Sequence, residues 1–370
     1  MIAANPDRYR VVGLSAGGSQ LERLCQQVSQ HHPAVVGLPS ASDEAATALQ
    51  ALGTKVESGT DANEQLAAVD GADIVLNAIT GAAGLLATLA ALKAGKTLAL
   101  ANKESLVIGG RLVTDAAQPG QIVAVDSEHS AIAQALRAGR RDEVRRVILT
   151  ASGGPFRGWS RERLSGVTPD QAMHHPTWHM GRVITINSAT LVNKGLELLE
   201  ASLLYGIPLD RIQVVVHPQS VVHSGVEFVD GAAILQASPP DMKLPIGLAL
   251  AWPERLAGVA QSCDWTQAAQ WTFEPLDDVT FPAVGLARRA GEAGGTAPAV
   301  FNAANEVAVD AFCDGRLGFL GITKIIETVL DLHLGDTSFV ANDDLTLESL
   351  LGADTWARQM VAKLVTWNGD

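Results

Sequence analysis

Two short segments of the sequence place acidic side chains at spacings that could support chemistry. In the first, Asp126 and Glu128 follow an apolar run that is expected to form a strand, and carboxylates two residues apart on an extended backbone point the same way. In the second, Glu197 follows Asn193 and Lys194 by four and three residues, so all three side chains share one face of a helix. Taken alone, each segment also fits a structural interpretation, namely a solvated acid at a strand end and a Lys–Glu pair on a surface helix.

Two further features could bind an anion. The helix that carries Glu197 is expected to begin near Ser188, and a helix N-terminus with Ser, Asn and Lys side chains suits a phosphate. The turn Ser152-Gly153-Gly154 ends another expected strand, and its backbone donors and hydroxyl group would also suit an anion. A Gly-Gly turn is usually only a turn, so neither feature names a ligand by itself.

The segment 174–182 is rich in aromatic and imidazole groups and has neither helical nor strand periodicity. Its histidines suggest zinc, but Pro176 and the adjacent spacing are wrong for a compact site. We therefore expect this segment to form a mobile lid over a pocket. His223 lies in an expected strand, where a hydrogen-bonded structural histidine is the default interpretation.

The elements that must position these residues follow two patterns. In the first third of the chain, short apolar runs alternate with helical segments such as 82–93, which predicts a parallel sheet with right-handed crossovers. Ligands of such sheets bind at the carboxyl ends of the strands, which here are the turns at 16–19, 80–84 and 102–104. The expected strands cover residues 10–17, 34–39, 73–79, 97–101 and 122–126.

The middle of the chain is expected to be an α+β domain, because runs with strand character are interrupted by one long helix. A mixed stretch at 252–277 is interpreted as a surface linker, and the patterns from Phe281 onward are helical and punctuated by Gly or Pro. Strands are expected over residues 144–154, 181–189, 212–228 and 232–238. The predicted domain division is 1–126, 127–251, 252–277 (the linker) and 278–370.

The composition favours a globular protein of two or three domains, because 370 residues are too many for one ordinary core. Acidic residues outnumber basic ones by 40 to 27, and the net charge of -13 disfavours a nucleic-acid partner. Three widely spaced cysteines argue against a disulfide framework or a zinc site and favour a reducing compartment. Residues 74–92 are uncharged, but Asn and Gly interrupt them, so we expect a strand, turn and helix there and no membrane span. The N-terminus has no signal-peptide core, so a cytoplasmic location is expected.

Eight strings occur in the order found in one known family and cover nearly the whole chain: NAITGAAGL, LANKESLV, VDSEH, SGGPFR, HPTWHMGR, NSATLVNKGLE, HPQSVVHS and FNAANEVAV. On these strings the sequence closely resembles the 1-deoxy-D-xylulose 5-phosphate reductoisomerase family. The resemblance implies an α/β fold with a Rossmann-like doubly wound parallel sheet, an α+β catalytic domain and a C-terminal helical domain. It also implies a homodimeric enzyme that uses NADPH and Mg²⁺ or Mn²⁺. Its reaction is the isomerisation and reduction of 1-deoxy-D-xylulose 5-phosphate to 2-C-methyl-D-erythritol 4-phosphate, in the non-mevalonate isoprenoid pathway.

The resemblance also implies roles for individual residues. Metal ligation is implied for Asp126, Glu128 and Glu197, and three carboxylates suit a hard cation. The substrate phosphate is implied to be held by Ser152, Ser188, Asn193 and Lys194. Further substrate contacts or catalytic roles are implied for Lys103, Ser127, Glu128, Glu197, His175, Trp178 and His223, with His175 and Trp178 closing over the substrate. NADPH contacts are implied for Gly17, Gly18, Ser19, Asn102, Glu104 and Gly181, although Gly18 stands where relatives carry a lysine that could reach the adenosine 2′-phosphate.

The match to the family begins after the family's opening strand and Gly-rich turn. In a doubly wound sheet that strand is central, so we expect a gap in the parallel sheet beside the strand at 10–17, together with weak NADPH binding. Two alternatives stay open at this point. One is a related reductoisomerase-like oxidoreductase that acts on another phosphorylated sugar, and the other is a non-catalytic, truncated remnant.

Overall fold

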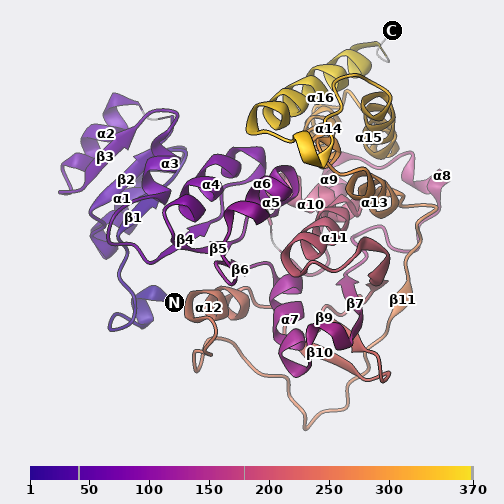
Figure 1. The fold of residues 1–370 in the computed structure, drawn as a ribbon, viewed down its shortest axis with the longest axis horizontal. Helices are drawn as coiled ribbons and strands as arrows, with labels where there is room; N and C mark the ends of the chain where they lie inside the picture. The colour runs from indigo at the N-terminus through magenta and orange to yellow at the C-terminus, as the bar shows by residue number, and fades with distance from the viewer. Residues whose placement is uncertain (41, 179, 368–370) are drawn as a thin grey trace. The chain divides into compact units, whose positions relative to one another are not determined.

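The computed structural model describes residues 1–40, 42–178 and 180–367, which form two compact units (Figure 1). The first unit consists of Met1–Asn102, Asp115–Val125 and Ile246–Val259. The second consists of Lys103–Thr114, Asp126–Pro245 and the described residues from Ala260 onward. The finer division into four segments remains a prediction. No helix in the described part of the chain is long and apolar enough to cross a membrane.

Six short parallel strands form two separate sheets in the first unit, with the orders β1-β2-β3 and β4-β5-β6. Five of the strands lie within the runs predicted from the sequence. The exception is β3, whose residues Lys-Val-Glu-Ser are too few and too polar to give a strand signal. The bounds are β1 (Gly13–Ser15), β2 (Val35–Leu38), β3 (Lys55–Ser58), β4 (Ile74–Asn77), β5 (Thr97–Leu100) and β6 (Ile122–Ala124).

The gap expected beside the strand at 10–17 is present at β1. Among the described residues, no strand pairs with the free edge of β1 or with that of β4. Leu76 in β4 is 42% exposed, although it is a large apolar residue within a strand. Backbone groups along these two edges therefore lack the strand partners that β2 and β5 have on both sides.

The helices of the first unit follow the apolar spacing of their sequences. In α1, Leu24 and Val28 are buried one turn apart and belong to the same apolar cluster as Val36 and Leu38 of β2. Figure 1 shows α1, α2 and α3 grouped with β1, β2 and β3. The bounds are η1 (Ile2–Ala4), α1 (Leu21–His31), α2 (Asp43–Gln50), α3 (Ala62–Ala67), η2 (Gly81–Gly84) and α4 (Leu85–Lys93), while α6 (Arg111–Ala116) and α12 (Lys243–Ala251) each have residues in both units.

A mixed five-stranded sheet lies in the second unit, in the order β10-β9-β7-β8-β11. Strands β7 and β8 are parallel, and the other three pairs are antiparallel. The predicted strands at 144–154, 212–228 and 232–238 are confirmed, the second of them as two strands. The bounds are β7 (Val144–Ala151), β8 (Ile212–Val216), β9 (Val222–Phe228), β10 (Ala233–Ala237) and β11 (Glu274–Pro275).

The predicted strand at 181–189 is wrong, because these residues form the helix α10 (Arg182–Ala189). Val183, Ile184 and Ile186 are β-branched and suggested a strand. In the structure, Thr185, Ile186, Asn187 and Ala189 are buried, so packing against neighbouring elements overrides the local preference.

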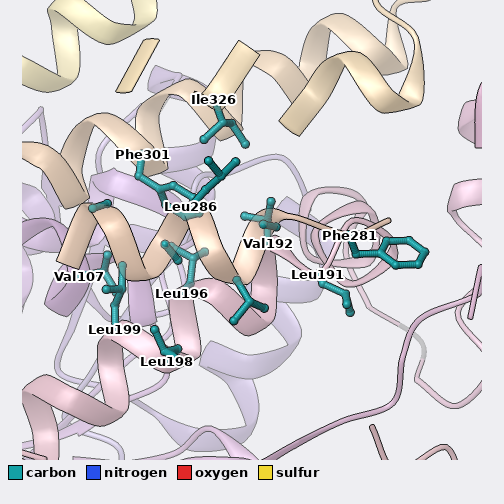
Figure 2. Close-up of a cluster of buried hydrophobic side chains, with 14 of the residues drawn as sticks. Val107, Leu191, Val192, Leu196, Leu198, Leu199, Phe281, Leu286, Phe301 and Ile326 are labelled. Atoms are coloured by element: carbon teal, nitrogen blue, oxygen red, sulfur yellow. The ribbon is translucent and has the colours of Figure 1, made fainter. Parts of the chain in front are cut away.

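Helices surround one large apolar core in the second unit. Figure 2 shows Leu196 of α11 near Phe301 of α14 and Leu286 of α13, all of which are buried. The helices predicted after Phe281 are confirmed. The bounds are α5 (Lys103–Gly109), α7 (Ser127–Ala135), α8 (Arg161–Leu164), α9 (Pro169–Ala172), α11 (Val192–Tyr205), α13 (Ala283–Ala293), α14 (Ala297–Cys313), α15 (Phe319–Leu334) and α16 (Leu347–Trp367), with 3-10 turns η3 (Leu136–Ala138), η4 (Arg141–Glu143), η5 (Leu209–Arg211) and η6 (Asn342–Asp344).

Candidate active site

Three carboxylates from two helices of the second unit converge on one point. Asp126 is the N-cap residue of α7, Glu128 lies in the first turn of that helix, and Glu197 is in α11. The expectation of an extended backbone across the first two is therefore wrong, because the helix begins at Ser127. One oxygen from each of the three carboxylates lies within 4.8 Å of the others. Because a cation with oxygen ligands at about 2.0–2.6 Å separates opposite ligands by roughly 4–5 Å, this spacing fits a divalent metal.

Two lysines neutralise part of this negative charge. Lys103, the first residue of α5, pairs with Asp126 and lies 2.9 Å from Glu197 through its Nζ atom. Lys194 lies 2.7 Å from Glu128 and also pairs with Glu197, three residues along its own helix. All of these side chains are at least four-fifths buried. The cluster is consequently a built arrangement of charges and not a set of surface ion pairs.

The charges in this cluster shift one another's pKa values. Burial opposes the ammonium charge of Lys103, but Asp126 and Glu197 outweigh it and raise the Lys103 pKa. Burial also opposes ionisation of Asp126, yet Lys103, His129 and Lys194 together outweigh it and lower the Asp126 pKa. In contrast, burial and the nearby Glu128 carboxylate raise the Glu197 pKa despite both lysines. A divalent cation among these oxygens would relieve the repulsion at Glu197, so the donor set fits a metal electrostatically as well.

The polar residues Asn193 and Ser127 extend the cluster. Asn193 donates through Nδ2 to Glu197 and accepts from the Nζ atom of Lys103 at 3.0 Å. The hydroxyl group of Ser127 donates to Glu128. The expectation that Asn193, Lys194 and Glu197 share one helix face is thereby confirmed.

The expected N-cap role of Ser188 is wrong, because Ser188 lies in the last turn of α10. Helix α11 begins only at Val192, after Leu191 adopts the left-handed conformation at φ 61°. Ser188 is nevertheless placed next to the predicted Gly-Gly turn. A Cβ atom on Gly154 would lie 2.7 Å from the carbonyl oxygen of Ser188, so only glycine allows this approach.

His175 connects the aperiodic segment to that same turn. Its Nδ1 atom accepts hydrogen bonds from the backbone N–H groups of Thr177 (3.1 Å) and Trp178 (2.9 Å). Its Nε2 atom therefore carries the proton and lies 3.2 Å from the hydroxyl oxygen of Ser152. Burial lowers the His175 pKa, which is consistent with this neutral ring. His179 lies outside the described residues.

His223 lies in β9, as predicted, and its Nε2 atom lies 3.2 Å from the backbone oxygen of Ser238. Burial lowers the His223 pKa. The ring also lines a small pocket of the second unit, which is formed by Ser127, Ser130, Gln134, His223, Gln236, Ser238, Asp241, Leu244 and Pro245. His223 and Ser127 therefore share one pocket, although neither role follows from this position alone.

The residues predicted to contact NADPH belong to both units. Gly17, Gly18 and Ser19 follow β1, where Gly18 has a φ of +80° and open space around its Cα atom. Asn102 donates to the backbone oxygen of Gly81 at 3.0 Å within the first unit. In the second unit, Glu104 lies in the first turn of α5, where burial raises its pKa, and Gly181 is the N-cap residue of α10. The cofactor roles of all six residues remain predictions.

Two fully buried residues next to the carboxylates received no role from the sequence. The Nε2 atom of His129 lies 2.8 Å from a carboxylate oxygen of Glu200. Asp126, His129 and Glu200 each offer one ligand atom within 4.8 Å of the others. The available signal was the spacing of Glu200, three residues after Glu197 in α11, but this spacing alone does not reveal a partner in α7.

Known protein families and individual proteins resemble this chain along nearly its whole length. The profile described as 1-deoxy-D-xylulose 5-phosphate reductoisomerase matches residues 1–110, that family's C-terminal domain matches 122–205, and a DXP reductoisomerase C-terminal domain matches 237–360. The 1-deoxy-D-xylulose 5-phosphate reductoisomerase of Cutibacterium acnes is 60% identical over 98% of this chain and 94% of its own length. The enzyme of the same name from Mycobacterium marinum is 58% identical over 99% of this chain and 89% of its own length.

Solved structures point to the same family. The 1-deoxy-D-xylulose 5-phosphate reductoisomerase of Zymomonas mobilis, in complex with NADPH, has a TM-score of 0.89 and 44% identity, over 98% of this chain and 94% of its own. A DOX-P reductoisomerase in complex with NADPH, fosmidomycin and magnesium has a TM-score of 0.91 and 36% identity, over 99% of this chain and 94% of its own. By sequence and by fold, the chain therefore belongs to the 1-deoxy-D-xylulose 5-phosphate reductoisomerase family.

Proposed function

We propose that this chain catalyses the NADPH-dependent isomerisation and reduction of 1-deoxy-D-xylulose 5-phosphate to 2-C-methyl-D-erythritol 4-phosphate. The observation that carries the proposal is the convergence of Asp126, Glu128 and Glu197, with ligand oxygens within 4.8 Å of one another, in a member of that enzyme family. Related structures contain NADPH and magnesium, which match the cofactors expected for this chain.

The three carboxylates are proposed to hold one Mg²⁺ or Mn²⁺ ion. When bound, such an ion supplies the Lewis acidity that polarises the carbonyl and hydroxyl oxygens of a hydroxyketone. Lys103, beside Asp126 and Glu197, places a fixed positive charge where alkoxide or enolate charge develops during the rearrangement of the carbon skeleton. NADPH, when bound, would supply the hydride that reduces the resulting branched aldehyde.

Ser152, Ser188, Asn193 and Lys194 are proposed to bind the substrate phosphate. The close approach of Gly154 to Ser188 brings the turn that carries Ser152 to the end of α10, which supports a shared role. Asn193 and Lys194 both contact Glu197, so the same two side chains can border a phosphate and a metal ligand. Binding the phosphate, which does not react, fixes the orientation of the reacting carbons.

The segment 174–182 is proposed to act as a lid. His175 holds its start against Ser152, and the ring accepts hydrogen bonds from two residues of the segment itself. Closure of His175 and Trp178 over the substrate would exclude water from the reactive intermediate. In this neutral form the ring can donate a hydrogen bond, but not a proton, through Nε2.

The decisive experiment measures NADPH oxidation by the purified chain with 1-deoxy-D-xylulose 5-phosphate, with and without Mg²⁺ or Mn²⁺. Metal-dependent turnover is expected, and Glu197→Gln should abolish it. The matched control is Glu227→Gln. Glu227 is a partly buried residue of β9 that pairs with Arg146, and its variant should retain turnover. Turnover only with another phosphorylated sugar would favour a related oxidoreductase, and failure with every substrate would favour a non-catalytic protein.

A homodimer is also proposed, with a second copy covering the edge strand β10. Val229, Ile234 and Leu235, in β10 and the turn before it, are 64%, 41% and 41% exposed, and the outer edge of β10 pairs with no strand among the described residues. An exposed, apolar sheet edge suits strand pairing between copies. In sedimentation at micromolar concentration, the chain should be a dimer and Ile234→Lys should shift it toward the monomer.

The three free cysteines support work in a reducing compartment, which we propose to be the cytoplasm.

A further inference from the structure

The pair formed by His129 and Glu200 lies one turn deeper than the proposed metal ligands on the same two helices. His129 follows Asp126 by three residues in α7, and Glu200 follows Glu197 by three residues in α11. The side chains are 0% and 1% exposed, and Nε2 of His129 lies 2.8 Å from a carboxylate oxygen of Glu200. A shift of either side chain would therefore move the helix segments that carry the carboxylates.

Stability alone is a poor explanation for the pair. A buried ion pair seldom stabilises a fold more than apolar residues of similar size would, because both groups lose their hydration. Within the described structure, neither ring nitrogen of His129 and neither carboxylate oxygen of Glu200 makes a well-aligned hydrogen bond. Burying the pair therefore costs free energy of folding. Its position beside Asp126 points to a role in supporting that carboxylate.

The surroundings hold His129 in place from the other side as well. The hydroxyl group of Tyr205, at the end of α11, donates to the backbone oxygen of His129 at 2.6 Å. Two contacts therefore join α11 to α7 behind the carboxylates, one through Glu200 and one through Tyr205. Metal ligands in proteins are commonly oriented by such outer partners, whose loss weakens metal binding.

We propose that Glu200, acting through His129, is a positioning residue that holds the carboxylate of Asp126 in the orientation needed for binding a divalent cation. The proposal rests on the proposed function, because it assumes that Asp126, Glu128 and Glu197 bind that cation. It adds residues that touch neither the cation nor the substrate. Glu200 keeps the imidazole fixed, and the imidazole occupies the space beside the Asp126 carboxylate.

The test is Mn²⁺ binding to the full chain, measured by the paramagnetic resonance signal of free Mn²⁺, together with kcat at saturating Mn²⁺. Glu200→Gln keeps the size of the side chain and removes its charge. We expect its Kd for Mn²⁺ to rise by about 10- to 100-fold, the range seen when outer partners of metal ligands are changed. Saturating Mn²⁺ should restore most of kcat, whereas Glu197→Gln should not recover. Glu227→Gln is again the matched control and should bind Mn²⁺ as the wild type does.

A second variant covers the case in which Glu200→Gln does not fold. The double variant His129→Phe with Glu200→Leu leaves no unpaired charge behind and is expected to fold, but its Mn²⁺ Kd should rise similarly. Wild-type Mn²⁺ affinity in either folded variant would overturn the positioning role and leave the proposed function intact. Absence of Mn²⁺ binding by the wild-type chain would instead overturn both the proposed metal site and the positioning role that depends on it.

Discussion

Lys194 lies 2.7 Å from Glu128 on another helix and also pairs with Glu197 on its own helix. This ammonium group therefore links two of the three proposed metal ligands. Burial opposes its charge, but Glu128 and Glu197 outweigh burial and raise the Lys194 pKa. Lys194 is therefore charged at neutral pH.

Lys194→Met should destabilise the metal-free protein, because it leaves two buried carboxylates close together. Removing one partner of a buried pair costs about 3–5 kcal/mol. Mg²⁺ should recover much of the lost stability, since it supplies positive charge to the same oxygens, so the variant should gain more in Tm from Mg²⁺ than the wild type gains. Thermal melts of both proteins with and without Mg²⁺ measure this difference, and equal gains would contradict the prediction.

Asp126 should make the free energy of unfolding of the metal-free protein fall at acidic pH. Lys103, with His129 and Lys194, outweighs burial and lowers the Asp126 pKa in the folded chain, so the unfolded chain binds the proton more readily. The contribution of Asp126 to stability is therefore present above the unfolded value of about 4 and is lost as the pH falls below it. Asp126→Asn should lower stability at pH 7 and lose less of it on acidification. Denaturant unfolding from pH 7 to pH 3 tests this, and parallel curves for the two proteins would refute it.

Local sequence patterns predicted the strands and helices in which apolar residues recur at a regular spacing. Strands β2 and β5 are short, mostly apolar runs, and both lie within their predicted ranges. The helix α10 was missed because its β-branched residues favour a strand until the rest of the unit buries them. The break at Leu191 could not be predicted, because a leucine at φ 61° is unfavourable locally and requires support from its surroundings.

The candidate site was predictable only in part for a similar reason. Asp126, Glu128 and Glu197 came from motifs, and the structure brings their oxygens together. The pairing of His129 with Glu200 joins residues that are distant in the sequence, and no periodicity within either helix indicates it. Contacts of this kind depend on how α7 and α11 pack, which no local pattern in either segment specifies.

Gly195 should be required where α11 approaches α13. A Cβ atom at this position would lie 2.8 Å from the Cβ atom of Ala287 and 3.1 Å from the backbone oxygen of Ala283. Gly195→Ala should therefore destabilise the protein by about 1–3 kcal/mol through overpacking and should lower turnover, because Lys194 and Glu197 share this helix. Adding Ala287→Gly removes the closest clash and should restore part of both. Denaturant unfolding and the NADPH assay on the single and double variants decide the matter, and no recovery in the double variant would count against the packing explanation.

Trp178→Ala should weaken substrate binding without weakening the fold. The side chain is only half-buried, and the backbone N–H group of Trp178 donates to Nδ1 of His175. Removing the indole should therefore leave Tm nearly unchanged, while KM for 1-deoxy-D-xylulose 5-phosphate rises and kcat falls, because the proposed lid no longer excludes water. Trp265→Ala is the matched control, since that indole is 75% exposed outside the site and should change neither quantity. A large fall in the Tm of Trp178→Ala with unchanged kinetics would instead show that residues 174–182 support the fold and do not cover the substrate.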